Sequence, residues 1–231
     1  ALKDICGFTM IRHVYMRCML AKTLDDVFVA TDSEKIAEEV SAFSGKVIMT
    51  SSHHETGTDR IAEASENLEC DIVVNVQGDE ALVNPEYVDK VVSAVKADET
   101  VNVGILINPY FKSNSPSDIK TVVDENMNVM YFSRADIPSD SRTSSPPMYK
   151  AYHIIPFRKD FLLQYAKWPK GKLERIEFNE YLRILEKGYK IRAVEVESDA
   201  VSVDTEADLD YVRSKMPEDP FFPQYKNNVL S

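Results

Sequence analysis

A ten-residue run that ends in two carboxylates constrains this chain more than any other segment. Residues 71–80 read DIVVNVQGDE: an apolar, β-branched middle stops at Gly78 and is followed by Asp79 and Glu80. Such a run predicts a strand buried on both faces, which is typical of a parallel sheet. Because open α/β sheets bind ligands at the carboxyl ends of their strands, we expect the two carboxylates at a binding edge.

A second segment repeats this arrangement far along the chain. Residues 201–205 read VSVDT, which predicts a short apolar strand, then the carboxylate of Asp204, then a helix start at Thr205. Two carboxylates at strand ends suit Mg²⁺, which proteins usually hold with one or two carboxylates plus substrate phosphates. The alternative is that each Asp only caps the following helix. The repetition favours a metal site formed by Asp79 and Asp204.

Composition excludes several classes of protein. The 231 residues suffice for one α/β domain, and a net charge of −11 argues against a nucleic-acid or anionic-membrane surface. No apolar run approaches the ~20 residues that cross a bilayer, and the N-terminus does not resemble a signal peptide. Three cysteines without metal-ligand spacing indicate reduced thiols. We expect a cytoplasmic protein without a nucleic-acid or membrane partner; an anionic small substrate stays open, because a few basic groups and a metal can override the net charge.

Helix and strand patterns alternate along the chain, which predicts an α/β fold with a single domain over residues 1–216. Residues 103–157 read as an inserted hairpin region, residues 136–147 as a mobile loop, and residues 217–231 as an irregular tail. The helices are expected over residues 34–43, 58–68, 173–186 and after 84 and 205; the strands are expected over residues 27–30, 46–49, 71–76, 103–107, 121–123, 129–132, 151–157, 190–196 and 201–203.

Four motifs together resemble a known family. They are ETGTDRIAE at 55–63, NVQGDE at 75–80, YFSR and IP at 131–134 and 137–138, and VDT at 203–205. Their order and spacing are similar to those of the CMP-KDO synthetases, the 3-deoxy-manno-octulosonate (KDO) cytidylyltransferases, from about residue 2 to 216. The resemblance implies a Rossmann-like nucleotidyltransferase with a mostly parallel central sheet and helices on both faces. It also implies a homodimer formed through residues 103–157.

The implied reaction transfers CMP from CTP to an acidic sugar with Mg²⁺ and releases pyrophosphate, as a step toward lipopolysaccharide. Catalysis of this kind depends mostly on positioning and charge neutralisation. Asp79 and Asp204 would hold the metal, and Arg134 would pair with the sugar carboxylate. The alternatives are a surface salt bridge for Arg134 and a solvated residue in the first helical turn for Arg60. The nucleotide-binding set is Thr56, Gly57, Arg60 and Gln77; the substrate-binding set is Gln77, Arg134, Tyr152, His153, Glu177, Glu180 and Tyr181.

The chain departs from the family at its start. The family begins with an apolar strand and a loop that cradles the triphosphate, whereas this sequence begins just beyond that loop. Because loss of a central strand would leave unpaired backbone groups, we expect the natural protein to carry roughly twenty more residues.

A second departure concerns the sugar pocket. Residues 151–158 read AYHIIPFR where the family has His-Leu-Gly-x-Tyr-x-Tyr-Arg, so Ala151 and Ile155 replace a His and a Tyr. Tyr181 replaces a Gln, while Glu180 is kept and Glu177 is placed one turn away on the same helix. Losing polar contacts should change the acceptor to a KDO-like acid other than plain KDO. The alternative is a local realignment in which His153, on the same strand face as Ala151, takes the missing role.

Two other classes of function remain open at this point. One is a metal-dependent glycosyltransferase, although its usual Asp-x-Asp motif is matched only at residues 208–210, inside a predicted helix. The other is a catalytically silent binding protein of the same fold.

Overall fold

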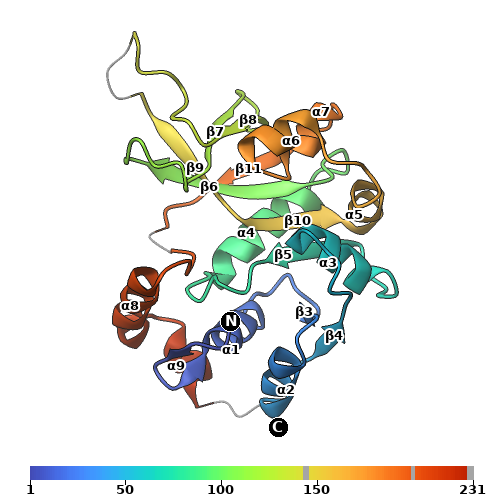
Figure 1. Cartoon of the computed structure of the whole chain (residues 1–231), viewed down its shortest axis with the longest axis vertical. Helices are drawn as coiled ribbons and strands as arrows, with labels where there is room; N and C mark the ends of the chain where they lie inside the picture. Colours follow the sequence, from blue (N-terminus) through green and yellow to red (C-terminus); the bar gives the residue numbers. More distant parts are fainter. Residues whose placement is uncertain (143–145, 199–200, 228–231) are drawn as a thin grey trace. The chain divides into compact units, whose positions relative to one another are not determined.

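The computed structural model describes residues 1–142, 146–198 and 201–227 (Figure 1). These residues form two compact units. Unit 1 comprises Ala1–Leu68, Val76–Asp89 and the described residues from 201 onward, and unit 2 comprises Glu69–Asn75 and Lys90–Ser198. None of the described helices is long and apolar enough to cross a membrane.

Unit 1 contains short strands surrounded by helices. The β1–β2 pair is antiparallel and the β3–β4 pair is parallel. Helices α2 and α3 confirm two predicted helices to within a few residues, whereas the helix α1 was not predicted. The elements are β1 (Asp4–Ile5), β2 (Phe8–Thr9), α1 (Met10–Cys18), β3 (Val29–Thr31), α2 (Glu34–Ala42), β4 (Val47–Met49), α3 (Gly57–Ser65), α8 (Glu206–Lys215), the 3-10 helix η1 (Met216–Glu218) and α9 (Phe222–Lys226).

The C-terminal segment is part of the core of unit 1, so the prediction of an irregular tail is wrong for residues 217–227. Phe222 and Tyr225 of α9 are buried in one apolar cluster with residues of α1 and α8. The fully buried guanidinium of Arg17 pairs with Asp219 at 2.5 Å, and His13 Nδ1 lies 2.7 Å from the Tyr225 hydroxyl. A polar pair enclosed by an apolar cluster fixes this segment on α1. Residues 228–231 lie outside the described part of the chain.

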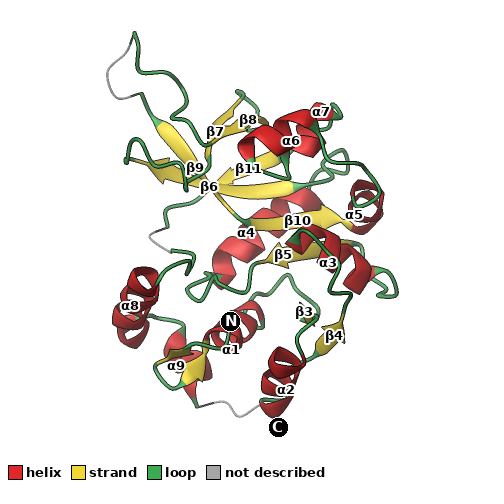
Figure 2. Cartoon of the chain, in the orientation of Figure 1, coloured by secondary structure: helices red, strands yellow, loops and turns green. Residues whose placement is uncertain are grey.

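Unit 2 is built on a five-stranded sheet in the order β11-β6-β9-β7-β8 (Figure 2). Only the β11–β6 pairing in this sheet is parallel, so the sheet is mixed rather than mostly parallel. The predicted hairpin is confirmed as β7–β8. The strands are β6 (Gly104–Tyr110), β7 (Lys120–Val123), β8 (Val129–Ser133), β9 (Met148–Tyr152) and β11 (Arg192–Glu195); the helices are α5 (Lys159–Tyr165), α6 (Lys172–Glu177) and α7 (Leu182–Glu186).

Strand β5 (Ile72–Val76) and helix α4 (Pro85–Lys96) lead the chain from one unit to the other and back. The side chain of Asn84 accepts the Glu86 backbone N–H at 2.8 Å, which confirms the predicted start of α4. β5 pairs with β10 (Ile154–Arg158) in a two-stranded sheet, and Asn75 is the one buried residue of β5. The expectation that β5 is buried on both faces is therefore wrong.

Two further elements differ from the sequence-based expectation. Residues 151–157 form parts of two strands, because β9 belongs to the five-stranded sheet whereas β10 pairs with β5, and the chain changes sheets at His153. Residues 173–186 form two helices, because Phe178 adopts a left-handed backbone conformation with φ of 50°. The Asn179 side chain then accepts the Tyr181 backbone N–H at 3.0 Å and closes the turn.

The predicted mobile loop over residues 136–147 lies outside the named strands and helices where it is described, and residues 143–145 fall outside the described part. The α/β class is confirmed.

Candidate functional site

The carboxylates of Asp79 and Asp204 lie near one another in unit 1. The Val203 backbone N–H donates to the Asp79 carbonyl at 3.1 Å, and the Ser202 hydroxyl donates to the Glu80 carboxylate. Residues 201–204 belong to no strand, which corrects the predicted strand. These two bonds hold the segment before Asp204 beside the loop that carries Asp79.

The environment of Asp79 fits a bound cation. Its Oδ1 atom is buried and accepts no hydrogen bond from any described residue. Burial raises the pKa of Asp79, and the neighbouring Asp204 carboxylate raises it further. A cation would remove both unfavourable effects. No group of three or more His, Cys, Asp or Glu side chains in the described residues could hold a metal, so further ligands would have to come from phosphate or water.

Three of the predicted nucleotide-binding residues lie together at the start of α3. Thr56 is the N-cap of this helix, and its Oγ1 accepts the Asp59 backbone N–H at 3.1 Å. A Cβ added to Gly57 would lie 3.0 Å from Gln77 Nε2, so the Gln77 amide packs against the first turn. This places a side-chain amide beside backbone N–H groups of a helix N-terminus, which suits an anionic or polar ligand.

Arg60 is not the solvated residue of the alternative interpretation. Its Nη1 donates to Thr50 Oγ1 at 2.7 Å and to the Ser51 carbonyl at 3.3 Å, and lies 3.1 Å from Asp32 Oδ1. One turn along α3, both carboxylate oxygens of Glu63 accept the Ser51 backbone N–H, at 3.0 and 3.2 Å. Arg60 therefore fixes the segment after β4 onto α3.

Arg134 and Glu177, two residues of the predicted substrate-binding set, are hydrogen-bonded to each other in unit 2. Arg134 Nε donates to the Glu177 carbonyl at 2.8 Å, and Nη2 donates to the Phe178 carbonyl at 3.2 Å. The Glu177 carboxylate in turn accepts the Arg134 backbone N–H at 2.8 Å and the Ser133 hydroxyl at 2.9 Å. The described bonds of the guanidinium end on backbone carbonyls, which leaves its charge available to an anionic ligand.

Four further residues of the predicted substrate-binding set lie in unit 2, and two of them, His153 and Tyr181, are in contact. His153 stacks on the Tyr181 ring with centroids 5.8 Å apart. Burial lowers the pKa of His153 to about 4, and the charges of Lys150 and Arg134 act in the same direction, so the imidazole is neutral at pH 7. Tyr152 and Tyr181 are buried. Glu180 Oε2 accepts the Tyr165 hydroxyl at 3.2 Å.

Two expectations about this pocket need correction. Glu177 and Glu180 do not lie one turn apart on one helix, because α6 ends before Phe178. His153 cannot share a strand face with Ala151, because β9 ends at Tyr152. Ala151 and Ile155 are each 1% exposed and belong to the core.

Sequence reasoning missed Lys120, which contacts the backbone of Arg134. The available signal was a single lysine inside the apolar run 119–123, since a lysine in a buried strand needs polar partners.

Comparison with known proteins identifies the family. The family model described as "Cytidylyltransferase" matches residues 1–191. A 3-deoxy-manno-octulosonate cytidylyltransferase of Geobacter metallireducens is 40% identical over 94% of this chain and 91% of that protein. The chain belongs to the cytidylyltransferase family.

Two further similarities describe its place among cytidylyltransferases. An 8-amino-3,8-dideoxy-manno-octulosonate cytidylyltransferase of Shewanella halifaxensis is 39% identical over 94% of this chain and 92% of that protein. A solved CMP:2-keto-3-deoxy-manno-octonic acid synthetase, complexed with CTP, superposes with a TM-score of 0.91 at 36% identity, covering 94% of this chain and 91% of the other. Cytidylyltransferases of this type generally use a divalent metal. The resemblance drawn from the four motifs is confirmed, and the glycosyltransferase alternative falls away.

Proposed function

We propose that this cytidylyltransferase transfers CMP from CTP to KDO or a closely related eight-carbon acid and releases pyrophosphate. The observation that carries the proposal is the carboxylate pair of Asp79 and Asp204, in which a buried oxygen of Asp79 has no hydrogen-bond donor among the described residues. The names of the similar proteins and the CTP complex of the similar structure support the choice of nucleotide and acid.

Each unit supplies its own part of the chemistry in this proposal. In unit 1, Asp79 and Asp204 would hold Mg²⁺, which would supply positive charge against the phosphates. Thr56, Gly57 and Gln77 bind the nucleotide at the start of α3, and Arg60 shapes the adjoining loop. In unit 2, the Arg134 guanidinium pairs with the carboxylate of the acid in a charge-assisted hydrogen bond.

The acceptor is proposed to be a KDO-like acid other than plain KDO. Ala151 and Ile155 offer no hydrogen-bonding side chain and are buried, and Tyr181 offers only a hydroxyl beside the neutral His153. A lost partner for a sugar hydroxyl costs roughly 1–3 kcal/mol. Competing the 8-amino acid against KDO measures this preference; a kcat/KM for KDO equal to or above that for the 8-amino acid would contradict it.

We further propose a homodimer formed through residues 103–157. Large apolar side chains are exposed in and near the β7–β8 hairpin: Met130 is 62% exposed, Ile176 61% and Phe178 79%. Burial of these exposed apolar side chains between two copies of the chain would favour association. Sedimentation equilibrium should give twice the 26.2 kDa chain mass, whereas a concentration-independent monomer would refute this part of the proposal.

Pyrophosphate release tests the carboxylate pair. Asp79→Asn and Asp204→Asn should each lower turnover by at least about a hundredfold in the presence of Mg²⁺, because each removes a charged ligand. Asp210→Asn is the matched control, because Asp210 lies on the same C-terminal segment but pairs with Arg213 at 3.2 Å. Turnover by either site variant within a few-fold of the parent would show that the pair does not bind the metal.

A further inference from the structure

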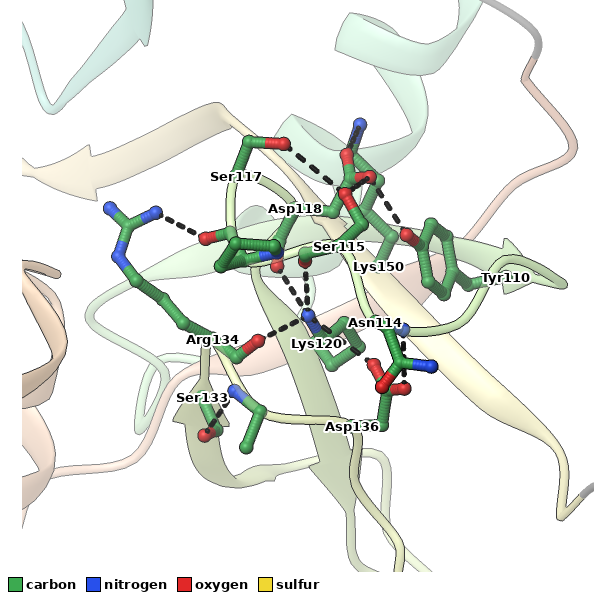
Figure 3. A network of polar contacts seen from close by, with 12 residues as sticks. Tyr110, Asn114, Ser115, Ser117, Asp118, Lys120, Ser133, Arg134, Asp136 and Lys150 are labelled. Atoms are coloured by element: carbon green, nitrogen blue, oxygen red, sulfur yellow. Dashed lines mark hydrogen bonds and ion pairs between the residues drawn. The ribbon is translucent and has the colours of Figure 1, made fainter.

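Lys120 is a fully buried lysine at the start of β7, within unit 2. Figure 3 shows its ammonium at the centre of a polar network. Nζ donates to the carbonyls of Ser115 at 2.6 Å and Asp118 at 2.9 Å, and to the carbonyl of Arg134. The Asp136 carboxylate lies 3.5 Å away.

This arrangement uses all three donors of an ammonium on backbone oxygens. A lysine is almost never fully buried without such partners, because its charge must leave water. The bonds join two segments, the loop 115–118 and the chain at 134–136. Lys120 therefore sets the spacing between these segments, and an apolar side chain would leave the carbonyls without donors.

The same two segments define where the Arg134 guanidinium lies. Its Nη1 donates to the Pro116 carbonyl at 2.7 Å, within the loop that Lys120 holds. The Arg134 carbonyl is bound directly by Lys120. Both the backbone of Arg134 and one acceptor of its side chain are thus fixed by one buried charge.

A separate set of bonds anchors the other side of the loop. The Asp118 carboxylate contacts Lys150 Nζ at 2.5 Å, and accepts the hydroxyls of Tyr110 at 2.7 Å and Ser115 at 2.8 Å. Although burial opposes it, these donors lower the pKa of Asp118 to about 2. Lys150 therefore stabilises the loop without bonding the chain at Arg134, which makes it a matched control.

We propose that Lys120 is a positioning residue for the acidic substrate, because it places the Arg134 guanidinium. The inference rests on the proposed function, in which Arg134 binds the carboxylate of the acid.

Steady-state kinetics of Lys120→Met in the full chain test this role. Methionine retains the length and apolar stem of the side chain but removes its charge and donors. The KM for the acid should rise about tenfold or more, while the KM for CTP stays within about twofold. Lys150→Met should lower the thermal midpoint with an unchanged ratio of the two KM values. Equal rises of both KM values in Lys120→Met would overturn the inference.

A double-mutant cycle with Arg134→Ala separates this inference from the proposed function. If Lys120 acts through Arg134, the double variant should have the same acid KM as Arg134→Ala alone. An acid KM in the double variant that rises by the product of the two single-variant increases would overturn the inference. An unchanged acid KM in Arg134→Ala would instead overturn the assigned role of Arg134. If Lys120→Met does not fold, Asp136→Asn is measured in its place. Its KM for the acid should rise about threefold while its KM for CTP is unchanged, and no rise in the KM for the acid would count against the inference.

Discussion

Breaking the ion pair between Glu174 and Arg183 should destabilise the protein strongly. The two side chains are 6% and 3% exposed. Arg183 Nε lies 2.8 Å from one Glu174 oxygen and Nη2 lies 2.5 Å from the other, so the pair is bidentate. It joins α6 to α7 across the turn that carries Glu180 and Tyr181. Arg183→Met keeps the apolar stem and removes the charged fork.

The expected loss follows from the contacts that the substitution removes. Leaving one member of a buried pair without its partner costs about 3–5 kcal/mol. The bond from Arg183 Nη1 to the Trp168 carbonyl, 3.3 Å long, contributes about 1 kcal/mol. The Gly171 backbone N–H still donates to Glu174 at 2.8 Å and offsets part of the cost. We expect a net loss of about 3–5 kcal/mol in the free energy of unfolding.

Urea denaturation followed by tryptophan fluorescence measures this loss, because Trp168 is the one tryptophan of the chain and lies beside the pair. The midpoint should fall with an unchanged m-value. Glu174→Gln combined with Arg183→Met should cost less than the sum of the single changes. Lys3→Met, which breaks an exposed pair with Glu206, should leave the midpoint unchanged. A loss below about 1 kcal/mol for Arg183→Met would refute the reasoning.

Two further predictions concern pH and the nucleotide. Burial lowers the pKa of His13 and of His153 to about 4 from an ordinary value of 6.5, so between these two values the unfolded chain binds more protons than the folded one. The free energy of unfolding should therefore be constant above about pH 6.5 and should fall as the pH drops toward 4, by up to about 3 kcal/mol for His13. Thermal midpoints that do not change between pH 7 and 4.5 would contradict this. Gly57→Ala should raise the KM for CTP several-fold with little change in thermal midpoint. The reason is that the Cβ of the new alanine would lie 3.0 Å from Gln77 Nε2 and displace that amide. An unchanged KM for CTP would show that the amide does not contact the nucleotide.

The local sequence predicts those elements whose cause is itself local. Residues 72–76 of the predicted strand form β5, Asn84 caps α4, and the valines at 88, 91, 92 and 95 are all buried. Asp79 also lies just beyond the end of β5, as predicted. In each case the pattern of apolar residues and the capping residue act within one or two turns.

The sequence does not predict elements that depend on distant partners. Residues 173–186 have the apolar spacing of one helix, yet the carbonyls of Glu177 and Phe178 bind Arg134 instead of the next helical turn. The last described segment has no regular sequence pattern, and it is ordered by hydrogen bonds of the Tyr225 hydroxyl with His13 and Arg17 of α1. The role of Lys120 depends on carbonyls up to fourteen residues away. Such contacts are decided by tertiary packing, which overrides local preference.

Identification of the product by mass spectrometry tests the central claim most directly. The full chain, supplied with CTP, Mg²⁺ and either KDO or its 8-amino analogue, should form a CMP–acid conjugate and one pyrophosphate for each conjugate. UTP and ATP should give far less product, and omission of the acid should stop pyrophosphate release. Equal product formation from UTP or ATP, or pyrophosphate release without a CMP–acid conjugate, would contradict cytidylyl transfer to an acidic sugar.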